Sequence, residues 1–195
     1  MTTFVNLKII VLGASHSGKT SMIKKYITDR FSFDPHTTTG VDFFVKQYKK
    51  LKLSIWDASG NKNYKTIVET YYNQMMGAIV VFDSTYESLI CGEKWILSFL
   101  KINRLSVPIV LVSTKSDIDM FPGKRKATSE EIETFLNKYK IEYFIEVSSK
   151  NNNVCAPFEF LISEILNRDC ILPKNILDKK TNHINRKRFW LPFSF

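Results

Sequence analysis

Short hydrophobic runs alternate along the chain with longer stretches in which hydrophobic residues recur at helical spacing. The short runs predict β-strands at residues 5–12, 41–49, 51–56, 78–82, 109–113 and 143–147. The helical spacing predicts helices at residues 21–30 and 88–103, a helix opened by a capping box at residues 128–131, and a final helix capped by Asn153. Continuous apolar runs, as at 78–82 and 109–113, are typical of strands buried on both faces of a parallel sheet. The pattern therefore predicts an α/β fold with a six-stranded, mostly parallel sheet and helices on both faces.

Composition narrows the class of protein. The 195 residues fit one domain, and 44% hydrophobic residues supply a core, which excludes a wholly disordered chain. A net charge of +9 is compatible with nucleic acid or an anionic membrane as a partner, and it does not distinguish between them. The three scattered cysteines are too few for a disulfide framework or a metal cluster. No apolar run approaches the about 20 residues of a membrane span, and no secretory signal is visible, so we expect a cytoplasmic protein.

The sharpest local signal is the segment Gly13–Thr20, G-A-S-H-S-G-K-T, which matches the phosphate-binding pattern G-x-x-x-x-G-K-[ST]. It follows an apolar strand and precedes a helix, the context that a P-loop requires. The backbone N–H groups of such a loop cradle phosphates, while Lys19 would reach the β- and γ-phosphates and Thr20 would bind Mg²⁺. His16 stands at a position where a positive φ often calls for glycine, and histidine tolerates that region better than most residues do. We expect that histidine at this position leaves nucleotide binding unchanged, or else that it alters a contact with the nucleotide.

Three further motifs follow other predicted strands and distinguish between nucleotides. Asp57 can hold the Mg²⁺ shell at the end of a strand. In the run T-K-S-D at 114–117, the carboxylate of Asp117 can accept from the N1–H and the 2-amino group of guanine, donors that adenine lacks. The run V-S-S-K at 147–150 could offer backbone N–H to the guanine O6. All lie at carboxyl ends of strands, where α/β sheets bind ligands, and together they favour a guanine nucleotide.

At this point the chain resembles the Ras-like small GTPases, and among them the Rab family, over residues 7–166. The resemblance rests first on residues 38–43, T-T-G-V-D-F, which are similar to the Rab switch I signature T-I-G-V-[DE]-F. Switch II of the family, R-F-R-T-I, is matched by N-Y-K-T-I at 63–67. The family's V-Y-D-V-T stretch is matched by V-F-D-S-T at 81–85. The resemblance implies a Ras-like G domain of the P-loop NTPase class that binds GTP or GDP with Mg²⁺.

The resemblance also implies a role for each matching residue. The implied GTP-binding residues are Ser15, His16, Ser17, Gly18, Lys19, Thr20, Ser21, Phe31, Thr38, Gly60, Thr114, Lys115, Asp117, Ser148, Ser149 and Lys150. The implied metal ligands are Thr20, Thr38 and Asp57. The implied catalytic residues are Lys19, Gly60 and Asn61. An aromatic triad of Phe43, Trp56 and Tyr71 corresponds to the surface that shows the nucleotide state to effectors, although ordinary core packing would also explain aromatic residues. Effectors, an exchange factor and a GAP are the implied partners, and a monomer is expected.

Asn61, Ser59 and Thr114 are the departures from the family pattern that matter around the phosphate and base motifs. The family's D-T-A-G-Q is here D-A-S-G-N at 57–61, so Asn61 replaces the glutamine that orients the attacking water. Its amide is one methylene shorter, and Ser59 adds a hydroxyl, so we expect slow hydrolysis unless a GAP supplies what is missing. The alternative is an interaction scaffold held in the GTP state, and a P-loop kinase is a more distant one. Thr114 replaces the asparagine of N-K-x-D, and we expect little loss from it.

The last 25 residues, 171–195, differ in character from the rest. They carry +5 of the net +9, and aromatic residues accompany the basic ones. We interpret 1–170 as the G domain and 171–195 as a tail. No cysteine follows Cys170, so no prenylation motif is visible, and a basic and aromatic tail could contact an anionic membrane instead. A solvated tail, one folded back on the domain, or a nuclear address are the alternatives. Because the tail and a phosphate pocket account for the charge, no nucleic acid is expected.

Overall fold

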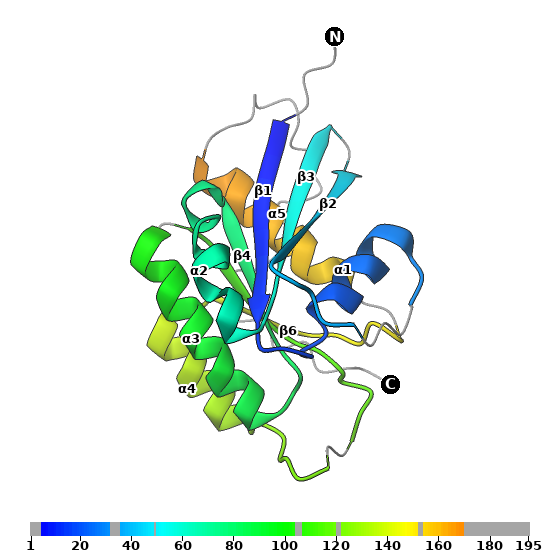
Figure 1. Ribbon diagram of the computed structural model, residues 1–195, viewed down its shortest axis with the longest axis vertical. Coiled ribbons are helices and arrows are strands. Elements are labelled where there is room, and N and C mark those ends of the chain that lie inside the picture. The colour runs from blue at the N-terminus through cyan, green and yellow to red at the C-terminus, as the bar shows by residue number, and fades with distance from the viewer. Residues whose placement is uncertain are drawn as a thin grey trace.

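The computed structural model describes residues 5–31, 36–48, 50–103, 107–119, 122–151 and 154–169 (Figure 1). Its strands are β1 (Val5–Gly13), β2 (Val41–Tyr48), β3 (Leu51–Ala58), β4 (Gly77–Phe82), β5 (Ile109–Ser113) and β6 (Tyr143–Glu146). Its α-helices are α1 (Lys19–Thr28), α2 (Lys65–Glu69), α3 (Tyr86–Asn103), α4 (Ser129–Tyr139) and α5 (Cys155–Asp169). Two 3₁₀ turns, η1 (Lys62–Tyr64) and η2 (Tyr72–Gln74), flank α2. The expected cap Asn153, Lys49 at the end of the expected strand 41–49 and the tail 171–195 lie outside the described residues.

One six-stranded sheet organises the molecule, with strand order β2-β3-β1-β4-β5-β6. β2 pairs antiparallel with β3, and every other pair is parallel. The prediction of a six-stranded, mostly parallel sheet is therefore confirmed. Because the parallel strands all point the same way, the loops after β1, β3, β4, β5 and β6 meet at one edge.

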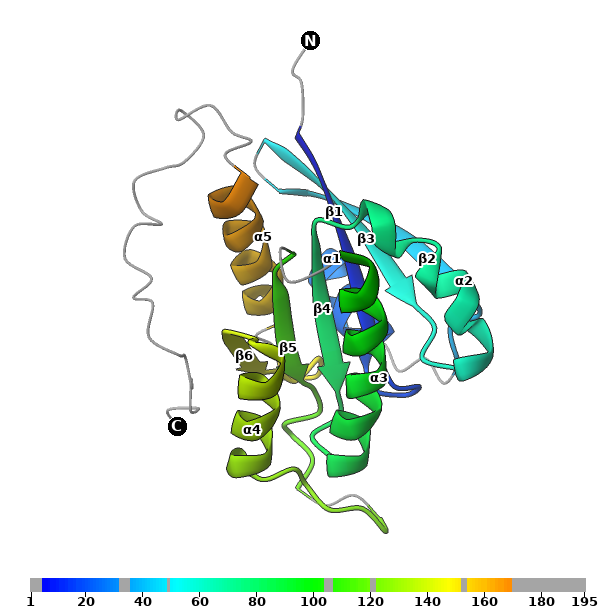
Figure 2. The same cartoon turned by 90° about the vertical axis from the view of Figure 1, so that its left-hand side faces the viewer.

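Side chains of alternate strand residues build a separate core on each face of the sheet. In β1, Leu7, Ile9 and Val11 face the core under α1 and α5, whereas Ile10 and Leu12 face the core under α2, α3 and α4. Figure 1 shows α1 and α5 on one side of the sheet and α2, α3 and α4 on the other. Figure 2 looks onto the second face, where α4, α3 and α2 follow one another across the sheet. The prediction of helices on both faces is thus confirmed.

Local sequence explains where several helices begin. At the start of α4, the Thr128 hydroxyl accepts from the Glu131 backbone N–H at 3.3 Å and the Glu131 carboxylate accepts from the Thr128 N–H at 2.9 Å, the capping box that the sequence predicts. Helix α1 begins at Lys19, two residues before the expected start, because Gly18 in a left-handed conformation ends the loop there. No described helix is long and apolar enough to cross a membrane.

Candidate functional site

The loop from Gly13 to Thr20 joins β1 to α1 at the carboxyl edge of the sheet. Gly13 has φ 142°, and a Cβ added there would lie 2.0 Å from the carbonyl oxygen of Val81, so only glycine fits. Gly18 has φ 88°, which places the first N–H groups of α1 at the mouth of the loop. His16 adopts the positive φ, 62°, that was expected of its position, and its side chain is exposed. The loop therefore has the backbone of a phosphate cradle.

Lys19, the first residue of α1, is almost completely buried beneath this loop. Its ammonium group donates to the carbonyl oxygens of Gly13 at 3.2 Å and Ala14 at 2.7 Å. Burial lowers the pKa of Lys19 to about 8, and the nearby Asp57 carboxylate opposes that shift. A buried ammonium with only neutral carbonyl acceptors is a strong attractor for an anion placed over the loop.

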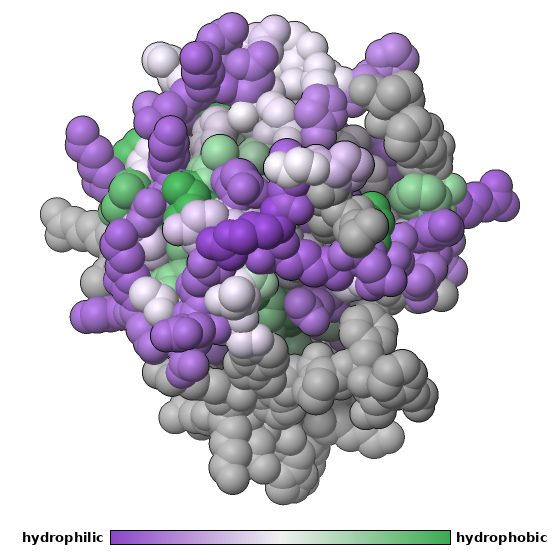
Figure 3. Space-filling model, turned by 90° about the horizontal axis from the view of Figure 1, so that it is seen from below, coloured by the Kyte–Doolittle hydropathy of each residue, from purple (hydrophilic) through white to green (hydrophobic). Residues whose placement is uncertain are grey.

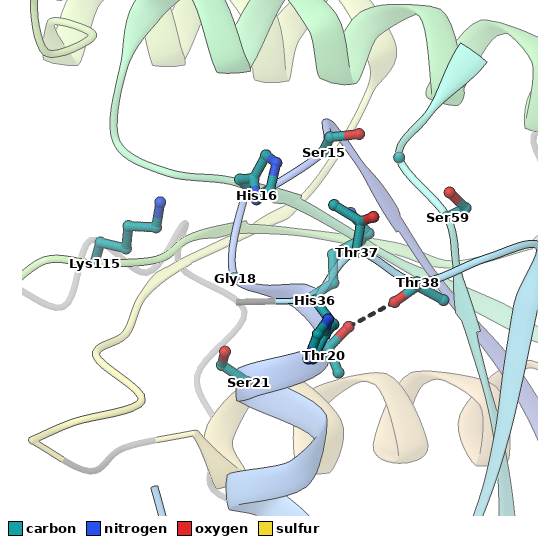
Figure 4. A pocket seen from close by; sticks show the side chains of 12 residues that line it. Ser15, His16, Gly18, Thr20, Ser21, His36, Thr37, Thr38, Ser59 and Lys115 are labelled. Carbon is teal, nitrogen blue, oxygen red and sulfur yellow. Dashed lines mark hydrogen bonds between the residues drawn. The ribbon is translucent and has the colours of Figure 1, made fainter. Parts of the chain in front are cut away.

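Three side-chain oxygens meet beside Lys19, from α1, from the segment before β2 and from β3. The Thr20 hydroxyl donates to Oδ2 of Asp57 at 2.5 Å. It also lies 3.0 Å from the Thr38 hydroxyl, the contact that is dashed in Figure 4. Asp57 is fully buried, and desolvation raises its pKa to about 6. Within the described residues its Oδ1 has no hydrogen-bond partner. A carboxylate with an unused buried oxygen, next to two hydroxyls, suits a hard divalent cation such as Mg²⁺.

Lys19, Thr20 and Thr38 line a cavity of about 200 Å³ at the carboxyl edge of the sheet, whereas Asp57 lies behind them and does not line it. Among the expected site residues, it is lined by Ser15, His16, Gly18, Lys19, Thr20, Ser21, Thr38, Gly60 and Lys115. It is also lined by His36, Thr37 and Ser59, of which His36 and Thr37 were missed as site residues because nothing local in their sequence marks them. In Figure 4, Lys115 lies on the opposite side of the loop from Thr38 and Ser59. Figure 3 looks onto this edge of the molecule, where hydrophilic residues predominate among those coloured.

The expected base-binding residues form a group beside this cavity, and hydrogen bonds tie it to the loop. The Thr114 hydroxyl lies 2.5 Å from the carbonyl oxygen of Ser17, and the Ser148 hydroxyl donates to Oδ1 of Asp117 at 2.6 Å. The backbone N–H of Lys150 in turn donates to the Ser148 hydroxyl at 3.2 Å. Asp117 is exposed, so its carboxylate is free to meet a ligand's donors. Of this group only Lys115, with φ 58° and an ion pair of 3.5 Å to Asp83, reaches the cavity wall.

The segment after β3 closes the other side of the cavity. A Cβ added to Gly60 would lie 2.2 Å from the backbone nitrogen of Ser15, so this glycine packs directly against the phosphate loop. The Asn61 side chain, by contrast, accepts from the Asn63 N–H at 3.0 Å and caps η1. Asn61 lines a neighbouring cavity instead of this one, whereas Ser59 and Gly60 line this one. The structure therefore does not bring Asn61 to the place where Lys19 and Thr20 converge.

The expected aromatic surface lies on the outside of the molecule. Phe43 is 55% exposed and meets the half-buried Trp56 edge to face, with ring centroids 4.9 Å apart. Tyr71 is 37% exposed at the start of η2, and Phe31 is 44% exposed after α1. Ordinary core packing therefore does not account for Phe43, because more than half of its surface remains in water.

Comparison with known proteins agrees with this geometry. The model of the Ras family matches residues 8–167, which include every motif described above. The chain belongs to the Ras family. It is similar to the Ras-related protein RabC of Dictyostelium discoideum, with 34% identity over 166 residues that cover 81% of this chain and 83% of that protein. It is also 32% identical to the Ras-related protein Rab-3 of Caenorhabditis elegans, over 83% of this chain and 74% of that protein. The Ras-related protein Rab-13 of Rattus norvegicus is 32% identical over 82% of this chain and 79% of its own length.

Membership settles the class of enzyme. This chain is a Rab-like small GTPase, and the α/β fold is that of a Ras-like G domain. The loop from Gly13 to Thr20 is its P-loop, and residues 38–43 and 63–67 are the segments that resemble switch I and switch II of the family. The described residues contain no group of three or more His, Cys, Asp or Glu side chains that could hold a metal ion.

Proposed function

We propose that this Rab-like protein binds GTP and GDP with Mg²⁺ in the cavity over the P-loop and acts as a switch. The observation that carries the proposal is the convergence of Lys19, Thr20, Thr38 and Asp57 from three separate segments. The ammonium and loop N–H groups would bind phosphate oxygens, and the three oxygen-bearing side chains would hold Mg²⁺. Bound Mg²⁺ would meet the unused Oδ1 of Asp57 and neutralise a carboxylate that is otherwise costly to bury.

Guanine specificity is proposed from the group beside the cavity. Asp117 would accept from the two donors on the guanine edge, and the hydrogen bond from Ser148 holds its carboxylate in place. The N–H groups of Ser149 and Lys150 would face the guanine O6, and the aliphatic part of Lys115 and the ring of Phe31 would flank the base. An adenine nucleotide would leave the Asp117 carboxylate without these donors.

The switch would act through Thr38 and Gly60. A γ-phosphate would order both by direct contact, and its loss would release them. The surface of Phe43, Trp56 and Tyr71, on which Phe43 and Tyr71 are exposed and Trp56 is half-buried, adjoins these segments and would pass the change to effector proteins in membrane traffic. An exchange factor and a GAP would set the state. The protein is proposed to act as a monomer, and residues 171–195 to contact an anionic membrane.

A second candidate follows from Asn61. Its side chain caps η1 and lines the neighbouring cavity instead of the P-loop cavity, and Ser59, not the family's alanine, lines the P-loop cavity. The protein would then hydrolyse GTP slowly and persist as a GTP-bound interaction scaffold. The scaffold and the switch differ only in how long bound GTP persists before hydrolysis when no GAP is present.

The nucleotide that copurifies with the full chain tests both candidates. Release by denaturation and chromatography should yield GDP or GTP, and removal of Mg²⁺ by a chelator should speed nucleotide release. GTP that persists for hours with Mg²⁺ supports the scaffold, whereas GDP supports the switch. Copurified ATP, or release unaffected by the chelator, would contradict the proposal.

A further inference from the structure

A second cavity, of about 490 Å³, lies next to the P-loop between η1–α2 and α3. Four lysines from separate segments line it, Lys62 in η1, Lys65 in α2, Lys94 in α3 and Lys124 in the loop before α4. All four are exposed, so their ammonium groups can gather around the opening while their methylene chains form part of the wall. Trp95 and Cys91 of α3 provide an apolar side.

The positive charge of this lysine cavity is only partly balanced. Lys65 pairs with Glu69 at 3.7 Å. In the part of the chain that the structure describes, Lys62, Lys94 and Lys124 make no ion pair. Of the two carboxylates in the wall, Asp83 is already paired with Lys115 at 3.5 Å, which leaves Glu87. The opening therefore has an excess of uncompensated positive charge, which favours an anionic occupant.

We propose that the lysine cavity binds an acidic segment of a partner protein. Three uncompensated lysines spread over three segments suit several carboxylates along an extended chain better than one compact phosphate group. The volume and the apolar wall of Trp95 and Cys91 leave room for one apolar side chain of that segment as an anchor. The same two helices also expose Ile67 at 50% and Leu97 at 53%, apolar surface that a protein partner would cover and a small anion would not.

This site is distinct from the proposed nucleotide function but adjoins it. Ser15 and Gly60 line both cavities, and Asn61 lines the lysine cavity alone. A bound segment would therefore rest against the start of switch II whichever nucleotide is present. If the protein did not bind nucleotide, the lysine cavity could still bind an acidic segment. If it did not bind the peptide, the P-loop cavity could still bind nucleotide.

A fluorescent peptide provides the first test with the full-length protein. A short peptide in which Asp and Glu flank one Phe should bind, and its affinity should fall as ionic strength rises. The same peptide with Asn and Gln in place of the acids should bind far more weakly. The triple variant Lys62→Glu, Lys94→Glu and Lys124→Glu should bind the acidic peptide at least about tenfold more weakly, because three modest ion pairs become repulsive contacts.

A matched variant distinguishes the effect of the cavity lysines on peptide affinity from the effect of the protein's net charge. Lys50→Glu, Lys52→Glu and Lys101→Glu change the net charge equally at exposed lysines outside the cavity. They should leave peptide affinity within about twofold, since distant exposed charges are screened. Equal losses in the two triple variants, or no binding by the unaltered protein, would overturn the proposal.

Cys91 reports occupancy without any substitution. Alkylation measured by mass spectrometry should slow at Cys91 when the acidic peptide is present, while the exposed Cys155 outside the cavity reacts at an unchanged rate. Inorganic triphosphate, added with the P-loop site filled by nucleotide, is the small-anion control. Protection of Cys91 by triphosphate and not by the peptide would overturn the assignment to a protein partner.

Discussion

The Thr114 hydroxyl lies 2.5 Å from the carbonyl oxygen of Ser17, across 97 residues of sequence. The same hydroxyl lies 3.1 Å from the carbonyl oxygen of Phe82, and Thr114 is buried. The segment that precedes the base-binding Asp117 is thereby fastened to the middle of the P-loop. Threonine, in place of the asparagine that the resemblance leads one to expect, keeps a donor at this junction.

Loss of that donor should weaken nucleotide binding. Thr114→Val preserves the shape and removes the hydroxyl, which leaves the carbonyl oxygen of Ser17 short of a donor and costs about 1–3 kcal/mol. The carbonyl oxygen of Phe82 keeps the backbone N–H of Thr114 at 2.8 Å. We expect GDP affinity to fall by about tenfold or more in a competition assay with a fluorescent nucleotide. Thr114→Asn should bind within about threefold of the unaltered protein, because its amide can donate to the carbonyl oxygen of Ser17. Equal affinity of the valine variant and the unaltered protein would show that the contact is not used.

Asn61 leads to a prediction about the rate of hydrolysis. Its side chain caps η1 by accepting from the Asn63 N–H at 3.0 Å, and it lines the cavity next to the one that holds Lys19. A glutamine would extend the amide by one methylene, enough for it to approach the attacking water. Misplacement by about 1 Å can cost about 100-fold in rate, so Asn61→Gln should raise single-turnover GTP hydrolysis by up to that factor. Asn61→Ala is the control and should match the unaltered rate. Equal rates for all three proteins would contradict a role for this position.

The site residues that lie together in the sequence could be predicted from it, whereas those that the fold brings to the site could not. The P-loop could be predicted because its glycines, lysine and threonine are contiguous and lie between a strand and a helix. His36 and Thr37 could not, since they reach the cavity only when the segment before β2 folds across it. The helix α2 was also missed, because its five residues bury only Val68 and show no hydrophobic periodicity. The capping of η1 by the Asn61 side chain depends on the η1 turn, which the motif alone does not encode.

A single methyl group at Gly60 should leave GDP binding intact and abolish the GTP-dependent change in switch II. Its added Cβ would lie 2.2 Å from the Ser15 nitrogen and 2.3 Å from the Ala14 carbonyl carbon, both backbone atoms that cannot yield cheaply. Gly60→Ala should keep GDP bound and lose the GTP-dependent protection of switch II against limited proteolysis. Gly92→Ala is the control, because its nearest neighbour would be Val80 at an ordinary 3.5 Å. That helical substitution should retain switching and add about 0.5–1 kcal/mol of stability. Normal GTP-dependent protection in the Gly60 variant would contradict the close packing.

The ion pair of Arg125 and Glu131 predicts how stability depends on acid. Both guanidinium nitrogens donate to the Glu131 carboxylate, at 2.5 and 2.8 Å, and these bonds, together with the one from the Thr128 N–H, lower the pKa of Glu131 to about 2. Because the folded pKa lies below the ordinary 4.5, this contribution to stability is complete above about pH 4.5 and disappears as the pH falls toward 2.

Thermal unfolding followed between pH 7 and pH 3 should therefore show a steeper loss of stability for the unaltered protein than for Glu131→Gln. The glutamine variant should begin less stable at pH 7, because it loses the ionised partner of Arg125 while it keeps an acceptor for the Thr128 cap. The two stability curves should converge toward pH 3, and parallel curves would show that this pair does not set the acid sensitivity of the β5–α4 connection.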